Sequence, residues 1–345
     1  MTLVEQVAPA HARSASGDVS RLSRCGHGDD FDDAFYTRSA RRARDRWIEI
    51  GEEEGAELFV GTGAVWFDAG EDAWVARAQG LMAAHDIPVE RLSPAEAAGL
   101  FPSLHTDDLA GVVFEPEAGV VRARDAVATL VARAVRDGAT LWPATARPTA
   151  TGAAEVDGAV LGADHTVWAC GPWLGRLFPG HARVRAARQD LFYWGVPPAW
   201  RADRIPAWVD IPTGGYGFGD LDGAGMKAVL EEIGEDLDPQ DGARISSPRI
   251  EAATRAFLAR RFPALAGAPM IASRVMAYEL TPDRHFLLAR LPETDNSWLA
   301  GGGSGHGFKH GPAIGTYMAD LLDGSAEPEE RFAAGPRPER IAPLG

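Results

Sequence analysis

The segment that most constrains this chain is residues 301–309, which read Gly-Gly-Gly-Ser-Gly-His-Gly-Phe-Lys. It follows a short apolar run at residues 297–300, and apolar residues recur at helical spacing from Ile314 onward. This order predicts a loop that joins a strand to the N-terminus of a helix. Glycine lets a ligand approach the backbone, and N–H groups at a helix start favour negative charge. The segment therefore predicts an anion-binding loop, with an ordinary glycine-rich turn as the alternative.

Length and composition limit the classes of protein that this chain can belong to. At 345 residues it is long enough for two domains of ordinary size. Its formal net charge of −15 would repel nucleic acid and anionic membranes, so neither is an expected partner. There is no run of about 18 apolar residues and no basic-then-apolar start, so we expect a soluble, cytoplasmic protein. Two cysteines, Cys25 and Cys170, indicate neither a disulfide framework nor a metal knuckle, and no metal site is predicted.

Local patterns near the start of the chain predict strands and one long helix. A strand at residues 2–6 carries the carboxylate of Glu5 near its end, and an amphipathic helix is predicted over residues 36–51. Two short apolar runs, residues 58–60 and 64–67, flank a Gly-Thr-Gly sequence. Glycines between two such runs predict a β-hairpin.

The rest of the chain alternates between helical and strand-like patterns. Residues 125–137 predict an amphipathic helix, and residues 166–170 predict a buried strand that runs into Gly171. Residues 192–229 contain short strand-like runs separated by proline and glycine, which indicates a sheet-rich middle portion. The tail beyond Gly324 is rich in Pro, Arg and Glu and is predicted to lie irregularly on the surface.

An acidic strand end, a Gly-Pro-Trp strand exit and the glycine-rich loop occur together in this chain. In this combination it resembles the family of FAD-dependent amine oxidases that includes D-amino acid oxidase, glycine oxidase and, most closely, monomeric sarcosine oxidase. The resemblance covers nearly the whole chain, and its most specific part is Ser-Gly-His-Gly-Phe-Lys at residues 304–309. The other matching positions are Val4-Glu5, Pro9, His11, residues 21–24, Thr62-Gly63, Glu115-Pro116, Gly119, Gly217-Phe218, Lys227, residues 281–286, Pro312 and Gly315.

The resemblance implies an α/β (α+β) fold with a Rossmann-like, dinucleotide-binding FAD domain and a substrate domain on a mixed or antiparallel sheet. The FAD domain is expected to comprise residues 1–50, 125–175 and 271–345, and the substrate domain residues 51–124 and 176–270. Family members begin with a strand, a Gly-x-Gly-x-x-Gly turn and a helix, whereas here the second strand follows the first methionine almost at once. We therefore expect a truncated FAD domain that lacks its first strand, or a start that has been assigned too late.

The resemblance also implies how FAD is bound. Glu5 corresponds to the acidic residue that hydrogen-bonds the ribose of the FAD adenosine. Residues 305–309 correspond to the segment beside the flavin pyrimidine edge, where a helix start and a lysine stabilise the negative charge of reduced flavin. The implied cofactor-binding residues are Glu5, His11, Arg21, Gly171, Trp173, Gly305, His306, Gly307 and Lys309.

Substrate-binding and catalytic residues follow from the same resemblance. Arg24 and Lys309 correspond to the pair that binds the substrate carboxylate; a guanidinium donates two parallel hydrogen bonds, whereas an ammonium acts as a point charge. Tyr216 corresponds to an aromatic residue of the substrate pocket. Lys227 corresponds to the lysine near flavin N5 that helps reduced flavin react with oxygen, and with His306 and Lys309 it forms the expected catalytic set. A lysine that snorkels to solvent from an edge strand is the alternative for Lys227.

Three positions depart from the sarcosine oxidase pattern. Met276 stands where those enzymes carry the cysteine that bonds the flavin, so we expect non-covalent FAD. Glu231 stands where a pocket histidine is expected, and Glu279 adds a carboxylate near Met276 in sequence. If these two carboxylates face the pocket, they favour a substrate with an additional cationic group; solvated carboxylates on strands are the alternative.

These residues predict an FAD-dependent amine oxidoreductase that oxidises the C–N bond of a carboxylate-bearing amine, an N-alkyl or cyclic amino acid, to an imine. O2 is the expected acceptor, which gives H2O2. The expected partner is a small-molecule amine or amino acid, bound by a monomer or small oligomer. The alternative function is a non-catalytic family remnant that has lost FAD binding and acts as a structural or interacting protein.

Overall fold

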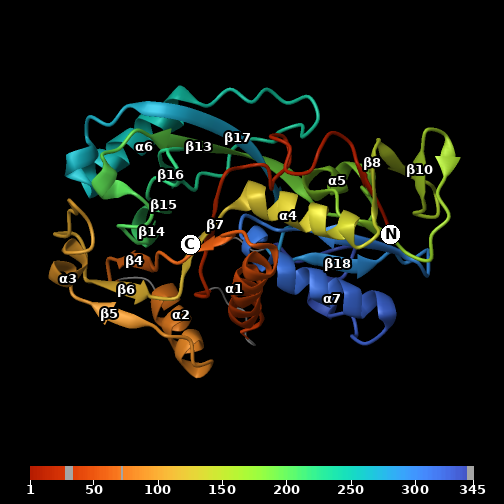
Figure 1. Cartoon of the computed structure of the whole chain (residues 1–345), viewed down its shortest axis with the longest axis horizontal. Coiled ribbons are helices and arrows are strands. Elements are labelled where there is room, and N and C mark those ends of the chain that lie inside the picture. Colours follow the sequence, from red (N-terminus) through yellow and green to blue (C-terminus); the bar gives the residue numbers. More distant parts are fainter. Residues whose placement is uncertain (28–33, 71–72, 340–345) are drawn as a thin grey trace.

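The computed structural model describes residues 1–27, 34–70 and 73–339 and shows a mixed α/β protein (Figure 1). An eight-stranded sheet lies on one side of the molecule and several smaller sheets lie on the other, with helix α1 (Phe35–Glu54) near the centre. This arrangement confirms the predicted fold class. None of the helices in the described ranges combines the length and apolar character that a membrane crossing needs.

The eight-stranded sheet joins two distant stretches of the chain. Its third and fourth positions from one edge, β4 and β14, pair in parallel, and every other neighbouring pair is antiparallel. The sheet is therefore mixed and mainly antiparallel. In order across the sheet, the strands are β17 (Met270–Leu280), β13 (Arg185–Trp194), β16 (Met226–Leu230), β15 (Gly215–Phe218), β14 (Ala207–Asp210), β4 (Ala64–Asp68), β6 (Gly111–Glu115) and β5 (Glu90–Leu92).

Helix α6 (Pro248–Arg261) packs against β13 and β16 of this sheet, and its sequence shows why it begins where it does. Ser247 caps the helix by accepting a hydrogen bond from the backbone N–H of Ile250, and a proline takes the first-turn position, where no N–H is needed. On the buried face, the ring of Phe257 stacks on Trp208 of β14 at a centroid distance of 5.4 Å. Burial of each such large side chain stabilises the folded state by roughly 1.5–3 kcal/mol.

The hairpin predicted around Gly63 is wrong. β3 (Phe59–Val60) pairs with β7 (Gly119–Val121) in a three-stranded sheet with β2 (Arg21–Ser23), whereas β4 belongs to the eight-stranded sheet. Gly63 has a positive φ of 66° and donates its N–H to the carbonyl of Ala118. A Cβ atom at this glycine would lie 2.6 Å from a neighbouring phenylalanine ring. The glycine therefore directs the chain from one sheet into another.

Parallel strand pairs and one further small sheet occupy the other side of the molecule. β1 (Thr2–Glu5) is parallel to β8 (Thr140–Pro143). β19 (Ser297–Gly301) lies between β12 (Thr166–Trp168), to which it is parallel, and β18 (Leu287–Arg290), to which it is antiparallel. The further sheet contains β9 (Ala146–Pro148), β10 (Ala154–Val156) and β11 (Ala159–Val160).

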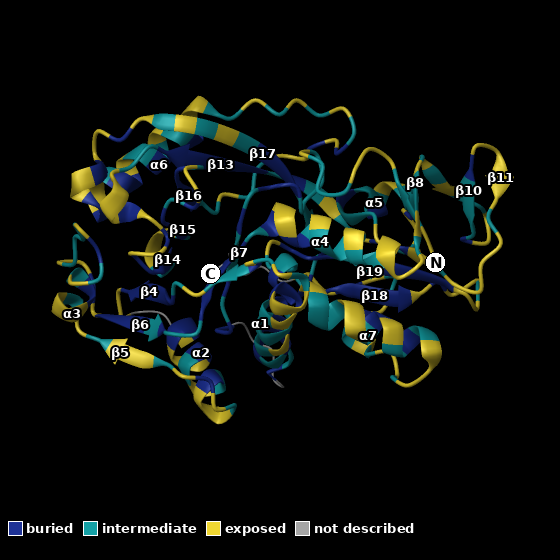
Figure 2. Ribbon diagram, viewed as in Figure 1, coloured by how far each residue is buried: buried dark blue, intermediate teal, exposed yellow. Residues whose placement is uncertain are grey.

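Helices α1 and α7 (Gly311–Asp323) pack together beside these strands through an apolar cluster that includes Tyr36, Phe286 and Met318. Figure 2 shows β18 largely buried, while α7 carries exposed residues on its outer face. The remaining helices are α2 (Ala73–Ala84), α3 (Pro94–Ala98), α4 (Ala123–Arg136) and α5 (Leu174–Leu177), and short 3₁₀ turns lie at Gly171–Trp173, Pro198–Trp200, Ile211–Thr213, Pro263–Leu265, Phe308–His310 and Glu330–Phe332.

Residues 325–339 of the tail form a single 3₁₀ turn and are mostly exposed or half-buried, which agrees with the predicted irregular surface tail. Two of their side chains are nevertheless buried. Phe332 is fully buried and packs against Phe286. Arg337 donates a hydrogen bond of 3.0 Å to Asp283, and both side chains are buried. One aromatic ring and one guanidinium therefore anchor this part of the tail to the core.

Candidate functional site

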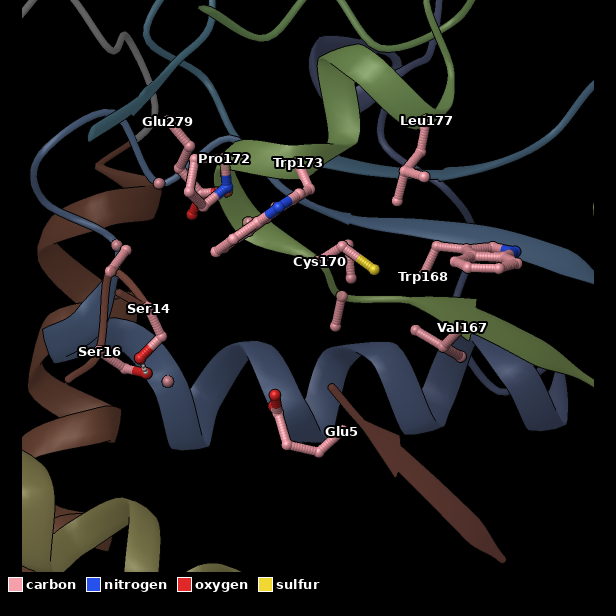
Figure 3. Close-up of a pocket in the computed structure, with 18 of the residues that line it drawn as sticks. Glu5, Ser14, Ser16, Val167, Trp168, Cys170, Pro172, Trp173, Leu177 and Glu279 are labelled. Atoms are coloured by element: carbon pink, nitrogen blue, oxygen red, sulfur yellow. Dashed lines mark hydrogen bonds between the residues drawn. The ribbon is translucent and has the colours of Figure 1, made fainter. Parts of the chain in front are cut away.

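One large cavity, of about 2130 Å³, lies beside the glycine-rich loop. Its walls include β1, the strand exit after β12, the end of β17 and most of residues 301–309. Figure 3 shows Glu5 of β1 on one side of this space and Trp173, which follows β12, on the other. Small-molecule sites usually occupy roughly 300–1,000 Å³, so this cavity has room for an extended ligand and a second, smaller molecule.

The glycine-rich loop connects β19 to α7, as its sequence predicts, through a short 3₁₀ turn. Gly302, Ser304 and Gly305 have positive φ angles of 71°, 45° and 85°. Ser304 is held in this conformation because its N–H donates to the carbonyl of Glu279 and its hydroxyl lies 3.0 Å from that of Thr281. The loop is thereby attached to the end of β17, which also lines the cavity.

All nine residues expected to bind FAD line this one cavity. Glu5 lies at the end of β1, and its Oε1 accepts a hydrogen bond of 3.3 Å from the backbone N–H of Val7. Across the cavity, the indole Nε1 of Trp173 is buried and has no hydrogen-bond partner among the described residues. A buried N–H without an acceptor is costly, and this one lies in the cavity wall, where a bound ligand would supply the acceptor.

Arg21 and His11, which are among these nine residues, also use their polar groups within the protein. The guanidinium of Arg21 donates to the carboxylate of Asp18 at 2.9 Å and to the carbonyls of Ser20 and Ala15. His11 accepts a hydrogen bond of 3.2 Å at Nδ1 from a backbone N–H two residues further on. These hydrogen bonds fix the positions of both side chains in the cavity wall.

Two cationic side chains from distant segments line the cavity together. The guanidinium of Arg24, which follows β2, lies over the rings of Trp66 and Trp74, 5.2 and 5.3 Å from their centroids. Lys309 lies in the 3₁₀ turn before α7 and is 4% exposed. After burial, the charges of Lys309 and Arg24 are the largest causes that lower the pKa of His27. Both cations therefore act on one region of the cavity, which suits an anionic group such as a carboxylate.

His306, which is half-buried in the cavity wall, belongs to a cluster of three histidines, of which only His306 was predicted as a site residue. The ring centroids of His27, His306 and His310 lie 5.6, 5.4 and 5.7 Å apart in pairs. Burial, followed by the charge of Lys309, lowers the pKa of all three, so they are neutral at pH 7. Nε2 of His306 lies 3.2 Å from the carbonyl of Arg284, which only accepts, so Nε2 carries the proton and Nδ1 is a bare acceptor. No group suited to a metal ion occurs in the described part of the chain.

This neutral cluster is expected to make the fold sensitive to acid. In the unfolded chain each histidine takes up a proton below its usual pKa of 6.5, whereas the folded protein resists protonation. Stability is therefore fully present above pH 6.5 and is lost as the pH falls below it. Replacing His310 with phenylalanine should make this loss shallower between about pH 7 and pH 5 in urea unfolding. His85→Phe, at a half-buried position after α2 and outside the cluster, should keep the original slope. Identical slopes for both variants would refute the cluster's role.

Two tyrosines and a carboxylate also lie together in the cavity wall. Tyr216 of β15 lines the cavity, and its hydroxyl lies 3.1 Å from that of Tyr278. Sequence reasoning missed Tyr278, although it lies two residues after Met276 on β17 and so points to the same face of that strand. Glu231, directly after β16, lines the cavity as well. Glu231 therefore faces the cavity, and for that case the sequence predicts a substrate with an additional cationic group.

Glu279 of β17 lines the same cavity beside Trp173 (Figure 3). Burial raises the pKa of its carboxyl to about 7, although the backbone N–H groups of Gly303 and Gly302 favour the ionised form. Its Oε2 is buried and makes no hydrogen bond to any described residue. Oε2 of Glu279 and Nε1 of Trp173 are thus two polar atoms of the cavity wall to which a ligand would supply hydrogen-bond partners.

Lys227 is the one predicted site residue that the structure does not bring to the cavity wall. It lies on β16, between β13 and β15 and away from either edge of the sheet, and it is 1% exposed. The alternative of a lysine snorkelling from an edge strand is therefore wrong. Its Nζ lies 2.5 Å from Oδ2 of Asp18, a buried carboxylate that also accepts a hydrogen bond of 2.6 Å from Tyr193. Burial lowers the pKa of Lys227 to about 8, and Asp18 opposes this shift.

An α/β fold with a cavity of this size beside a glycine-rich loop is typical of oxidoreductases that bind an extended nucleotide cofactor. The FAD dependent oxidoreductase family matches residues 1–321, and the chain belongs to this family. It is 29% identical over 334 residues to the monomeric sarcosine oxidase of Streptomyces avermitilis, across 92% of this chain and 86% of that protein. It is 24% identical over 328 residues to the N-methyl-L-tryptophan oxidase of Yersinia pestis, with the same coverage of 92% and 86%.

Solved structures show the same fold. The L-proline dehydrogenase from P. horikoshii superposes with a TM-score of 0.85 at 17% identity, over 96% of this chain and 89% of that chain. The iminodiacetate oxidase from Chelativorans sp. BNC1 superposes with a TM-score of 0.78 at 22% identity, over 97% and 92%. The predicted family and the Rossmann-like, FAD-dependent fold are thus confirmed.

The cavity fits FAD, the cofactor of this family. Its volume exceeds that of an ordinary small-ligand site, and the orphaned polar atoms of Trp173 and Glu279 lie in its wall. Glu5, Trp173 and residues 305–309 would hold the cofactor. Met276, which we expect at the position of the covalent cysteine in the sarcosine oxidases, is 2% exposed and packs in an apolar cluster with Leu191, Val229 and Tyr216.

Proposed function

We propose that this protein is an FAD-dependent amine oxidoreductase that oxidises the C–N bond of a carboxylate-bearing amine, an N-alkyl or cyclic amino acid, to an imine. The observation that carries the proposal is the convergence of Arg24 and Lys309 on the cavity that the glycine-rich loop lines. Two cations beside one space recognise a carboxylate through charge-assisted hydrogen bonds. Relatives named sarcosine oxidase and N-methyl-L-tryptophan oxidase support this substrate class.

When bound, FAD supplies the two-electron redox chemistry. Arg24 and Lys309 bind the substrate carboxylate and orient the C–N bond. Their positive charges also lower the pKa of the substrate amine, which favours the neutral form that can be oxidised. The N–H groups of residues 305–309 and the Lys309 ammonium stabilise negative charge that develops nearby, and His306 keeps its proton at Nε2. The imine product leaves the site and is hydrolysed by water.

We also propose O2 as the electron acceptor, with H2O2 as the product, and non-covalent FAD. Relatives named sarcosine oxidase and N-methyl-L-tryptophan oxidase support the first point. Lys227 does not, because it lies outside the cavity wall and pairs with Asp18. Met276 supports the second point because a thioether in an apolar cluster forms no bond to a flavin.

Reconstitution tests the proposed function. The purified protein is incubated with excess FAD, desalted and examined by absorbance, and peroxide is then assayed with N-methyl and cyclic amino acids. We expect flavin absorbance to remain with the protein, to bleach anaerobically with substrate, and to be released by acid precipitation. Protein that retains no flavin, or flavin that no amine reduces, would refute the proposal. Reduced flavin that only artificial acceptors reoxidise would rule out O2.

A further inference from the structure

Glu231 is a carboxylate in the cavity wall to which the proposed chemistry gives no role. It follows β16 and lines the cavity together with Tyr216 and Tyr278. A Cβ atom at Gly305 would lie 3.1 Å from the ring of Tyr278 and 3.3 Å from Oε1 of Glu231. The carboxylate therefore lies close to both the tyrosine pair and the glycine-rich loop, in the part of the cavity where substrate is expected.

The charge of Glu231 helps to raise the pKa of both tyrosines. Burial, followed by this charge, raises the pKa of Tyr216. Burial, then Tyr216, then Glu231 raise the pKa of Tyr278 well above its usual value. Both phenols thus stay protonated and neutral at physiological pH, and their rings stand beside a carboxylate. Aromatic rings next to a carboxylate attract a cation, by ring electrostatics and by direct charge attraction.

We propose that Glu231, together with Tyr216 and Tyr278, binds a second cationic group of the substrate, an ammonium or guanidinium on the side chain of the amino acid. This inference rests on the proposed amine oxidation at this site. The amine that is oxidised must be neutral, and a carboxylate beside it would favour its charged form. The partner of Glu231 is therefore a group other than the reacting amine.

The charges of the cavity then match a substrate with two ionic ends. Arg24 and Lys309 take the substrate carboxylate, and Glu231 takes the cationic side chain. The preferred substrate is a basic amino acid with an alkylated or cyclic α-amine. An uncharged N-methyl amino acid would fill the same cavity without forming an ion pair with Glu231.

The experiment compares two amines of equal length, racemic Nα-methylornithine and racemic N-methylnorleucine. Their side chains differ only at the end, where ornithine has an ammonium and norleucine has a methyl group. Protein reconstituted with FAD is mixed anaerobically with each amine, and the second-order rate constant of flavin bleaching is measured. We expect the cationic amine to react about 10- to 100-fold faster. In Glu231→Gln this preference should be lost, because the rate constant for the cationic amine falls while that for the neutral amine stays within about threefold.

Glu232→Gln is the matched control. This neighbouring carboxylate is exposed, is not part of the cavity wall and pairs with Arg249 on the surface. The control should retain the full preference. No preference in the unaltered protein, or an equal loss for both amines in Glu231→Gln, would overturn the inference.

The inference and the proposed function fail in different ways. If neither of these two amines nor any amine of the N-methyl and cyclic panel bleaches the flavin, the proposed amine oxidation fails. Equilibrium binding of ornithine and norleucine, followed by tryptophan fluorescence, still measures the charge preference of the cavity. Tighter binding of ornithine that Glu231→Gln abolishes supports the cation subsite, and equal affinities overturn it.

Discussion

Replacing Asp18 with asparagine is expected to lower the free energy of unfolding by about 3–5 kcal/mol. The buried carboxylate of Asp18 lies 2.5 Å from Lys227, 2.9 Å from Arg21 and 3.3 Å from Arg274, and it accepts a hydrogen bond from Tyr193. Burial alone raises the pKa of Asp18, but the charges of Lys227 and Arg21 outweigh it and hold the pKa well below its usual range. Without the carboxylate, three cations face one another around a buried site. Urea unfolding at neutral pH measures the loss.

A double-mutant cycle separates the Asp18–Lys227 pair from its surroundings. Lys227→Met leaves Asp18 with its two arginines, so it should cost less stability than Asp18→Asn. Asp18→Asn combined with Lys227→Met should be more stable than Asp18→Asn alone, because the uncompensated buried ammonium is gone. Glu232→Gln, which breaks an exposed pair, should change stability little. Strictly additive effects in the cycle would disprove a coupled buried pair.

Replacing Lys309 with methionine is expected to lower kcat/KM for a carboxylate-bearing amine by about 10²- to 10³-fold. Lys309 is buried in the cavity wall, where water screens its charge weakly, and methionine retains much of its length without the charge. The backbone carbonyl of Lys309, which accepts a hydrogen bond from Trp47, is unaffected by the change. Steady-state kinetics and anaerobic flavin reduction measure the effect.

A substrate control separates carboxylate binding from a general loss of activity. An amine of similar size without a carboxylate should lose much less with Lys309→Met, because it makes no ion pair with the lysine. Lys309→Arg should recover part of the rate, since the charge remains but the planar guanidinium has a different reach. An equal loss for amines with and without a carboxylate would show that Lys309 does not bind that group.

Local signals in the sequence predict much of the fold and of the candidate site. Glycine content and apolar spacing predict the β19–loop–α7 order, because backbone freedom and helical periodicity depend on neighbouring residues. The family resemblance predicts nine residues that all line one cavity. The hairpin predicted at Gly63 shows where prediction from local patterns fails, since its two apolar runs pair with different, distant strands. A pattern of two strands and a turn does not specify which partner each strand finds.

The sequence by itself predicted the family, the α/β class and eleven of the residues that line the cavity, because the family resemblance rests on short motifs that the chain carries. Only the tertiary structure decided that Lys227 pairs with Asp18, 209 residues away, and lies outside the cavity wall. It also decided that His27 and His310 join His306, and that Glu231 faces the cavity. The physical reason is that side-chain direction, burial and charge pairing arise from contacts between segments that are far apart in the chain.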